Sequence, residues 1–195
     1  PPRGMGIDEA RREVERQMSE AIEREISKLN PAIPAIIVGH VTVYGATVGS
    51  ERSMMLGNDH VLLTSTLAWP QVECVALGHI HKYQVVRDTW PAVTYAGSIE
   101  RVDFSEEGDE KGFMTVDWLA RPGGGRRIQG TFHPLPARRF VTVDVEVSPT
   151  DTERSNPTEQ TLSAIDQADV KDAVVRVRVK MSTEEEAHFD EAEVR

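Results

Sequence analysis

Two short apolar runs that each end in glycine and histidine constrain the fold of this chain more than any other feature. Residues 35–38 read AIIV and are followed by GH, and residues 72–77 read VECVAL and are followed by GHIH. Runs that are apolar on both faces favour strands covered on both sides, as in the sheets of α/β proteins. The sequence therefore predicts an α/β or α+β fold, with further strands at residues 60–63, 93–97 and 113–119.

The remaining periodic segments predict a helix, a hairpin and a smaller second unit. Apolar residues recur at steps of three and four over residues 7–29, which indicates an amphipathic surface helix that ends before Pro31. Three glycines at 123–125 precede a returning strand at 128–135. Beyond residue 136, alternating strands at 139–147 and 173–181 flank a helical pattern at 159–167, and a capping box starts another helix at Ser182. We therefore expect two parts, residues 1–136 and a β-α-β unit at residues 137–195.

Composition excludes several classes of protein. The net charge of −10 gives no overall positive field, so any contact with nucleic acid would be local or supplied by a partner. Cys74 is the single cysteine, which excludes an internal disulfide framework and fits a reducing cytoplasm. No apolar run approaches the roughly 20 residues that span a bilayer, so we expect no membrane association. The chain opens with PPRG and lacks an initial Met, which suggests a fragment of a longer protein.

His40, His79 and His81 are the candidate functional side chains, because each follows a predicted buried strand and a glycine. The carboxyl ends of strands are where α/β proteins bind ligands. In extended geometry the rings of His79 and His81 would project to one side, and converging imidazoles favour a metal ion such as Mn, Fe or Zn. His40 alone would more simply be a hydrogen-bonded structural residue, whereas two histidines at one apolar strand end are harder to explain structurally.

Other histidines and cationic residues are weaker candidates. We interpret His60 as structural, and His133 and His188 as solvated. Phosphates could be neutralised near the glycine turn by Arg121, Arg126 and Arg127, or near the predicted boundary by Arg138 and Arg139, although a solvated hairpin tip explains the first group equally well. Arg176 and Arg178 lie on the polar face of a predicted strand, where alternating charge is ordinary, and they do not indicate DNA binding.

Three stretches in order resemble the SbcD-type DNA repair nucleases of the calcineurin-like metallophosphoesterase superfamily. They are GHVTVYGATVGSERS (39–53), ALGHIHKYQ (76–84) and TYAGSIERVDFSEEGDEKGF (94–113). The resemblance covers roughly residues 7–195. It implies the C-terminal part of a metallophosphoesterase β-sandwich flanked by helices, residues 1–136, followed by a capping domain, residues 137–195, that is truncated. It also implies DNA as substrate, an SbcC-like ATPase as partner, a homodimer in the full-length protein and a role in double-strand-break repair.

The same resemblance implies a two-metal site, usually filled by Mn²⁺. By motif, His40 and His79 would bind one metal and His81 the other, while Gly97 and Ser98 would shape the cleft. Two adjacent metals can clamp a phosphodiester and activate a water. The family's Asp-x-His, bridging Asp and Asn-His-Asp motifs, which precede the first histidine motif, are absent, and the Asn-Asp-His order at 58–60 does not replace them. We therefore expect no catalytic residue in this chain and no activity of the fragment alone.

Two other functions remain open from the sequence. A related phosphoesterase acting on nucleotides or phosphoproteins would agree better with the acidic charge. A non-catalytic scaffold, or a module that binds DNA or a partner, would agree with the missing carboxylates. If part of a sandwich is missing, several strands would be unpaired with uncovered apolar faces, so we also expect either a second polypeptide that completes the sandwich or strands paired between copies.

Overall fold

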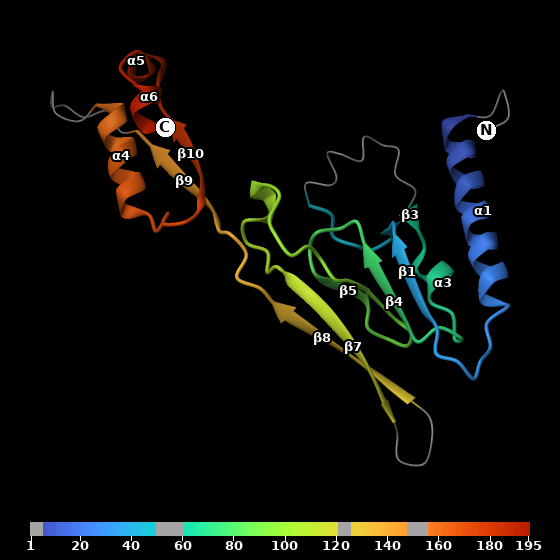
Figure 1. Ribbon diagram of the computed structural model, residues 1–195. Coiled ribbons are helices and arrows are strands. Elements are labelled where there is room, and N and C mark those ends of the chain that lie inside the picture. Colours follow the sequence, from blue (N-terminus) through green and yellow to red (C-terminus); the bar gives the residue numbers. More distant parts are fainter. Residues whose placement is uncertain (1–5, 50–60, 121–125, 148–155) are drawn as a thin grey trace. The chain divides into compact units, whose positions relative to one another are not determined.

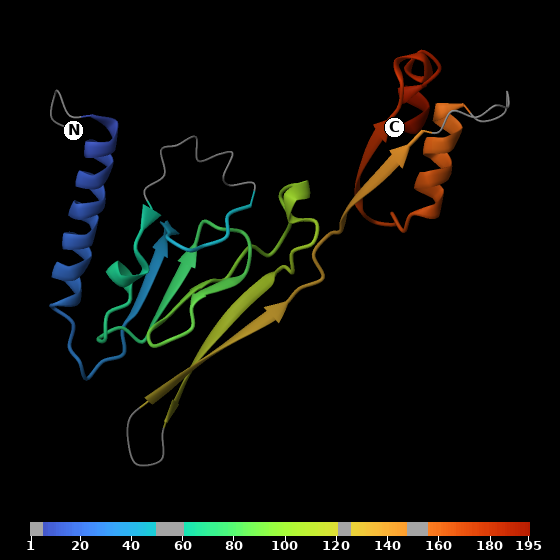
Figure 2. The same ribbon diagram turned by 180° about the vertical axis from the view of Figure 1, so that it is seen from behind.

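The computed structural model describes residues 6–49, 61–120, 126–147 and 156–195 of the chain, and Figures 1 and 2 show it from two sides. The residues divide into two units. The first contains Pro1–Glu100 and Gly108–Ala137, and the second contains Arg101–Glu107 and Arg138–Arg195. Helices and several separate sheets occur together, so the predicted mixed α/β class is confirmed. The assignment of the two parts to a nuclease domain and a cap stays a prediction.

Helix α1 (Ile7–Ile26) confirms the predicted amphipathic helix but ends three residues earlier. Its apolar side chains Met18, Ile22 and Ile26 pack on the core of the first unit, while Arg16 on the polar face pairs with neighbouring glutamates. After Ile26 the backbone tightens into turns, in which the Leu29 N–H donates to the Ile26 carbonyl. The last residue of the predicted stripe, Leu29, therefore lies beyond the helix and is exposed.

A four-stranded sheet forms the centre of the first unit, in the order β1 (Ile36–His40), β4 (Cys74–Gly78), β6 (Ala92–Tyr95) and β5 (Gln84–Arg87). The pairs β1–β4 and β4–β6 are parallel, and β5 runs antiparallel to β6. Val75, Leu77, Val93 and Tyr95 from β4 and β6 are buried in its core. The Tyr95 hydroxyl donates to the Val41 carbonyl and accepts from the Val43 N–H. Buried polar groups are thereby satisfied beside the apolar core.

Strand β1 does not have the predicted burial on both faces. Within the described residues it forms one edge of the sheet, and Ile36 and Val38 are 38% and 81% exposed. Strand β4, in the interior of the sheet, is largely buried as predicted. Apolar composition does not distinguish a central strand from an edge strand, which explains the error. The exposed face agrees with the expectation of uncovered strand faces, whereas completion by a second polypeptide or by pairing between copies stays a prediction.

A short strand pair and a hairpin complete the first unit. Strands β2 (Thr42–Val43) and β3 (Val61–Leu62) pair in parallel, and a one-turn helix, α3 (Thr64–Leu67), follows. Strands β7 (Gly112–Ala120) and β8 (Arg126–Pro134) pair antiparallel along their whole length, which confirms the predicted hairpin. None of the helices formed by the described residues is long and apolar enough to cross a membrane.

The second unit is the β-α-β arrangement that the alternating pattern predicts. Strands β9 (Phe140–Glu146) and β10 (Val174–Lys180) are parallel, and helix α4 (Pro157–Gln167) connects them. Val143 and Val145 pack towards Ala164 and Ile165 of α4. The short helices α5 (Thr183–Glu186), with its capping box, and α6 (Glu191–Val194) end the chain, and the 3₁₀ turn η1 (Phe104–Glu106) also belongs to this unit.

Candidate functional site

The predicted histidines lie where parallel strands end. Because β1, β4 and β6 run in the same direction, their carboxyl ends meet at one edge of the sheet. His40 is the last residue of β1, His79 follows β4 directly, and the Gly97-Ser98 segment follows β6. Figure 1 shows the β1 and β4 arrows side by side and pointing the same way. The topology therefore gathers the predicted residues at the ligand-binding edge of an α/β sheet.

The rings of His40 and His79 are neighbours. Their centroids are 5.1 Å apart, and the ring planes are inclined by 64°. Gly78, which pairs with His40 in the sheet, makes room for this approach, since a Cβ added there would lie 3.2 Å from His40 Nδ1. The glycine at position 78, just before His79, is thus explained sterically by the His40 ring beside it. Two of the three predicted ligands are brought together.

His79 has a strained backbone, with φ at 95°. A non-glycine residue in this region is uncommon, and such strain persists only where the surroundings hold the residue in place. The value also corrects one expectation: β4 ends at Gly78, so residues 79–81 are not an extended strand, and the alternation argument for placing the His79 and His81 rings on one side is wrong. That both imidazoles bind metal stays a prediction.

The backbone of His81 is fixed by several groups. Its carbonyl accepts from the Ser98 N–H at 3.0 Å and from Lys111 Nζ at 3.1 Å. Gly97 has φ of 78°, and a Cβ there would lie 2.9 Å from the same carbonyl and 2.8 Å from the Tyr83 nitrogen. Gly97 and Ser98 therefore contact the histidine segment itself, and their predicted cleft-shaping role is a matter for experiment.

The described residues contain no group of three or more His, Cys, Asp or Glu arranged to hold a metal ion. The imidazole pair is nevertheless compatible with one. Two imidazoles on one ion, with metal–nitrogen distances of ~2.1 Å, have ring centroids roughly 4.5–5.5 Å apart. The separation of His40 and His79 lies in this range. The donor set fits half of a site, and the described part of the chain adds no carboxylate to it.

The single cysteine is not part of this arrangement. Cys74 begins β4, at the end opposite to the histidines, and is buried. Burial, and next the charge of Glu73, raise the pKa of its thiol. A thiol with a raised pKa stays protonated at neutral pH and is a poor nucleophile.

Other predicted candidates are placed as follows. Arg121 and His60 lie outside the described residues, as do the side chains of Arg126 and Arg127 on β8, so contact between these arginines and DNA stays a prediction. His133 stacks on Phe113 and has Nε2 2.8 Å from Thr115 Oγ1, and His188 is exposed. At the predicted boundary, Arg138 contributes its carbonyl to Arg101 and Arg139 pairs with Asp169.

Sequence reasoning missed the groups that support the histidine segment. Lys111 is only 1% exposed and donates to both the His81 carbonyl and Ser98 Oγ. Lys82 pairs with Asp109, and the Tyr83 ring stacks on Phe132 with centroids 4.1 Å apart. The Lys-Gly-Phe at 111–113 carries part of the family resemblance, but no local signal indicates that Lys111 is buried against a loop 30 residues earlier.

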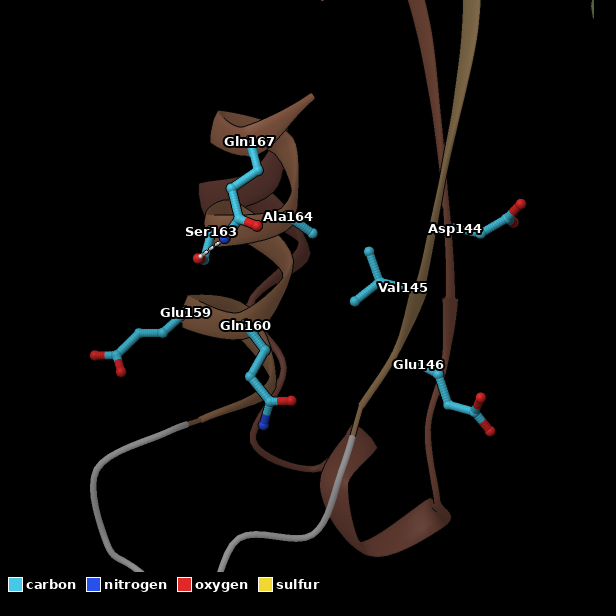
Figure 3. Close-up of a pocket in the computed structure, with 8 residues that line it drawn as sticks. All are labelled: Asp144, Val145, Glu146, Glu159, Gln160, Ser163, Ala164 and Gln167. Carbon is cyan, nitrogen blue, oxygen red and sulfur yellow. Dashed lines mark hydrogen bonds between the residues drawn. The ribbon is translucent and has the colours of Figure 1, made fainter. Parts of the chain in front are cut away.

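A hollow in the second unit does not provide a competing site. It lies between β9 and α4 and is drawn in Figure 3. The carboxylates of Asp144 and Glu146 point away from the helix, and each pairs with a cation of β10 instead. Val145 points towards α4, where Gln167 donates to Ser163 Oγ. The hollow therefore presents little convergent chemistry to a ligand.

The histidines at the carboxyl ends of β1 and β4 occupy the position at which α/β proteins commonly bind ligands. The chain is similar to the SbcD component of the nuclease SbcCD from Staphylococcus epidermidis, with 28% identity over 127 residues, 65% of this chain and 32% of that protein. It is also similar to the SbcD component of the nuclease SbcCD from Bacillus subtilis, with 30% identity over 108 residues, 55% of this chain and 27% of that protein. No family model matches the chain.

These relatives confirm the resemblance to SbcD-type nucleases as a distant one. The matched region spans about a third or less of the length of each relative, 32% and 27%. The activity, substrates and partners of a whole nuclease are therefore proposals for this chain.

Proposed function

We propose that this chain is part of a metal-dependent DNA exo- and endonuclease that hydrolyses phosphodiester bonds in double-strand-break repair. The observation that supports it most is the neighbouring pair His40 and His79, with His79 held in a strained backbone conformation at the end of β4. Strained backbone conformations of this kind cluster at functional sites. The similarity to the SbcD components of SbcCD nucleases supports the same class of reaction.

In this proposal His40 and His79 hold one Mn²⁺ and His81 holds the other. When bound, the two ions would supply Lewis-acid stabilisation of the phosphate and an activated water. The chain's own part is to present neutral imidazole nitrogens and to fix their direction. Gly78 leaves space for the His40 ring, while Ser98 and Lys111 bind the His81 carbonyl. Any acidic ligands of the ions would come from residues beyond the described set.

The isolated chain is inactive in this proposal. Its imidazoles carry no negative charge to offset the repulsion between two divalent cations. The described residues add no third ligand of the His, Cys, Asp or Glu type to the His40–His79 pair. Activity accordingly needs the acidic motifs that the family places before the first histidine motif.

The proposal includes DNA as the substrate, an SbcC-like ATPase as the partner, a homodimer of the full-length protein and a cytoplasmic location. Since the net charge is −10, phosphate contacts have to be local or come from the partner. The names of the relatives, each one component of the nuclease SbcCD, support a nuclease built from more than one kind of polypeptide.

The test uses the full-length protein that contains this sequence. With Mn²⁺ we expect cleavage of linear DNA, reduced by at least about 100-fold in His79→Ala, because a lost ligand removes the metal from the reacting phosphate. His188→Ala, which changes an exposed histidine of the second unit, is the matched control and should leave cleavage unchanged. Undiminished cleavage by a double variant of His79 and His81 would refute the proposal, and a comparison with nucleotide phosphodiesters identifies the preferred substrate.

A non-catalytic scaffold is the second candidate, favoured by the lack of a three-ligand cluster among the described residues. Calorimetric titration of the 195-residue chain with Mn²⁺ separates the candidates when it is combined with the activity of the full-length protein. Tight binding of two ions by the isolated chain contradicts the scaffold, whereas no heat at millimolar Mn²⁺, together with an inactive full-length protein, favours it.

A further inference from the structure

We propose that Lys111 is a positioning residue, which fixes the direction of the His79–His81 segment by binding its backbone. Lys111 is 1% exposed, and its Nζ donates to the His81 carbonyl at 3.1 Å and to Ser98 Oγ at 3.0 Å. The inference rests on the proposed function, since the direction of the imidazoles matters most where they bind metal.

Burying the Lys111 ammonium group costs free energy, which its hydrogen bonds have to offset. Lysine is among the residues least often buried, because removing its head group from water carries a large penalty that hydrogen bonds must offset. One of these bonds goes to the His81 carbonyl, in the turn that carries both histidines, and another goes to Ser98, whose N–H donates to the same carbonyl. An apolar residue of the same length would fill the space without that penalty. The polar choice therefore points to specificity of conformation at this turn.

Lys111 acts together with the segment after β6. The Ser98 N–H and Lys111 Nζ converge on one acceptor, the His81 carbonyl, and Ser98 Oγ in turn accepts from Lys111 and donates to the Glu100 carbonyl. This closed set of bonds links the ends of β4 and β6 to the start of β7. A lysine with three donors can hold two such acceptors at once.

The strained residue explains why such support is needed. His79 has φ of 95°, and Ile80, which follows it, is 1% exposed. Without restraint at His81, the segment could relax to an ordinary backbone conformation and turn the His79 ring away from His40. Removing a group that orients a metal ligand through hydrogen bonds typically weakens metal binding by roughly 10–100-fold.

The test compares three variants of the 195-residue chain. Lys111→Met keeps the length of the side chain and removes the donors, and Ser98→Ala removes one of the acceptors. Val72→Ala is the matched control, because it creates a cavity in the same core, and Val72 precedes the opposite end of β4. The readouts are NMR signals of the His79 and His81 rings, exchange of the amide at position 98, and Co²⁺ binding followed by absorbance.

We expect Lys111→Met to speed amide exchange at position 98 by about tenfold beyond its effect on global exchange, and to shift the ring signals, as loss of a buried hydrogen bond requires. Ser98→Ala should act in the same direction and less strongly, and it decides the matter if Lys111→Met does not fold. Val72→Ala should leave the ring signals in place. Equal ring shifts in the control, or wild-type ring signals in both test variants, would overturn the proposal.

The Co²⁺ titration separates this inference from the proposed function. If the wild-type chain binds Co²⁺, Lys111→Met should weaken binding by roughly 10–100-fold and alter the visible spectrum; equal affinity and spectrum would overturn the positioning role. If the wild-type chain binds no Co²⁺ while the ring signals still respond to Lys111→Met, the positioning role is upheld and metal binding by this chain is refuted.

Discussion

Cationic and polar side chains occur both around the histidine segment of the first unit and on the charged face of the second unit, but they differ in burial and in the atoms that they bind. Around His81, Lys111 is buried and Ser98 is half-buried, and both donate to the His81 backbone carbonyl. On the β9–β10 sheet, Arg178 binds Asp144 and Lys180 binds Glu146, but all four side chains are exposed. Exposed ion pairs contribute little, because water and salt compete with them. The comparison teaches that burial and a backbone target, more than charge, indicate where a conformation is being enforced.

Gly97→Ala should have the largest effect and tests whether the histidine segment is as tightly constrained as its contacts suggest. A Cβ at this position meets the Tyr83 nitrogen at 2.8 Å and the His81 carbonyl at 2.9 Å, and φ is 78°. We expect a loss of roughly 2–4 kcal/mol in the free energy of unfolding, from strain and steric overlap. Urea denaturation measures it. Gly108→Ala is the control, since nothing lies within 4 Å of its Cβ; equal losses in both variants would refute the constraint.

Tyr95→Phe should have an intermediate effect and tests the value of buried polar groups elsewhere in the first unit. Loss of the hydroxyl leaves the buried Val43 N–H without this acceptor. A loss of about 1–3 kcal/mol in the free energy of unfolding is expected. Tyr44→Phe, at a side chain that is 73% exposed, should change nothing measurable by the same denaturation experiment.

Arg178→Gln should have the smallest effect on stability and tests the exposed face. The hydrogen bond from Arg178 lowers the pKa of Asp144, so any stabilisation from this pair is present above the unfolded carboxyl pKa and is lost as pH falls through the lower folded value. In the variant, an NMR titration should show the Asp144 pKa rising towards its ordinary range. The unfolding midpoint at pH 7 should stay unchanged; a clear fall would mean that the face contributes more than exposure implies.

Much of the architecture could be predicted because it follows from local periodicity. The β-α-β unit and the β7–β8 hairpin are found within a few residues of their predicted bounds, since alternation and the glycine turn are strong signals. Strands β2 and β5, helix α3 and turn η1 were missed, because two to four residues carry no readable period. The exposure of Val38 depends on which strand lies at the edge, which is a property of the whole sheet.

The candidate site was predictable only in part. The rule of strand, glycine and histidine places His40 and His79 together, because parallel strands end at one edge. The left-handed backbone of His79 was not predicted, and the neighbouring His81 is held by Ser98 and Lys111, which are distant in sequence. Lys111 stands in a polar turn with no pattern of its own. Tertiary contacts of this kind leave no trace in local sequence.

The membership of Arg101–Glu107 in the second unit has a practical consequence for anyone dissecting this chain. Phe104 packs on Phe140, the Arg176 guanidinium lies 4.4 Å from the Phe104 ring centroid, and Glu107 accepts from Thr142. Residues on both sides of this stretch belong to the first unit, so the polypeptide passes from one unit to the other three times. A fragment that begins at Arg138 would lack Phe104, which packs on Phe140. A transfer of the second unit to another protein would therefore have to include both Arg101–Glu107 and Arg138–Arg195.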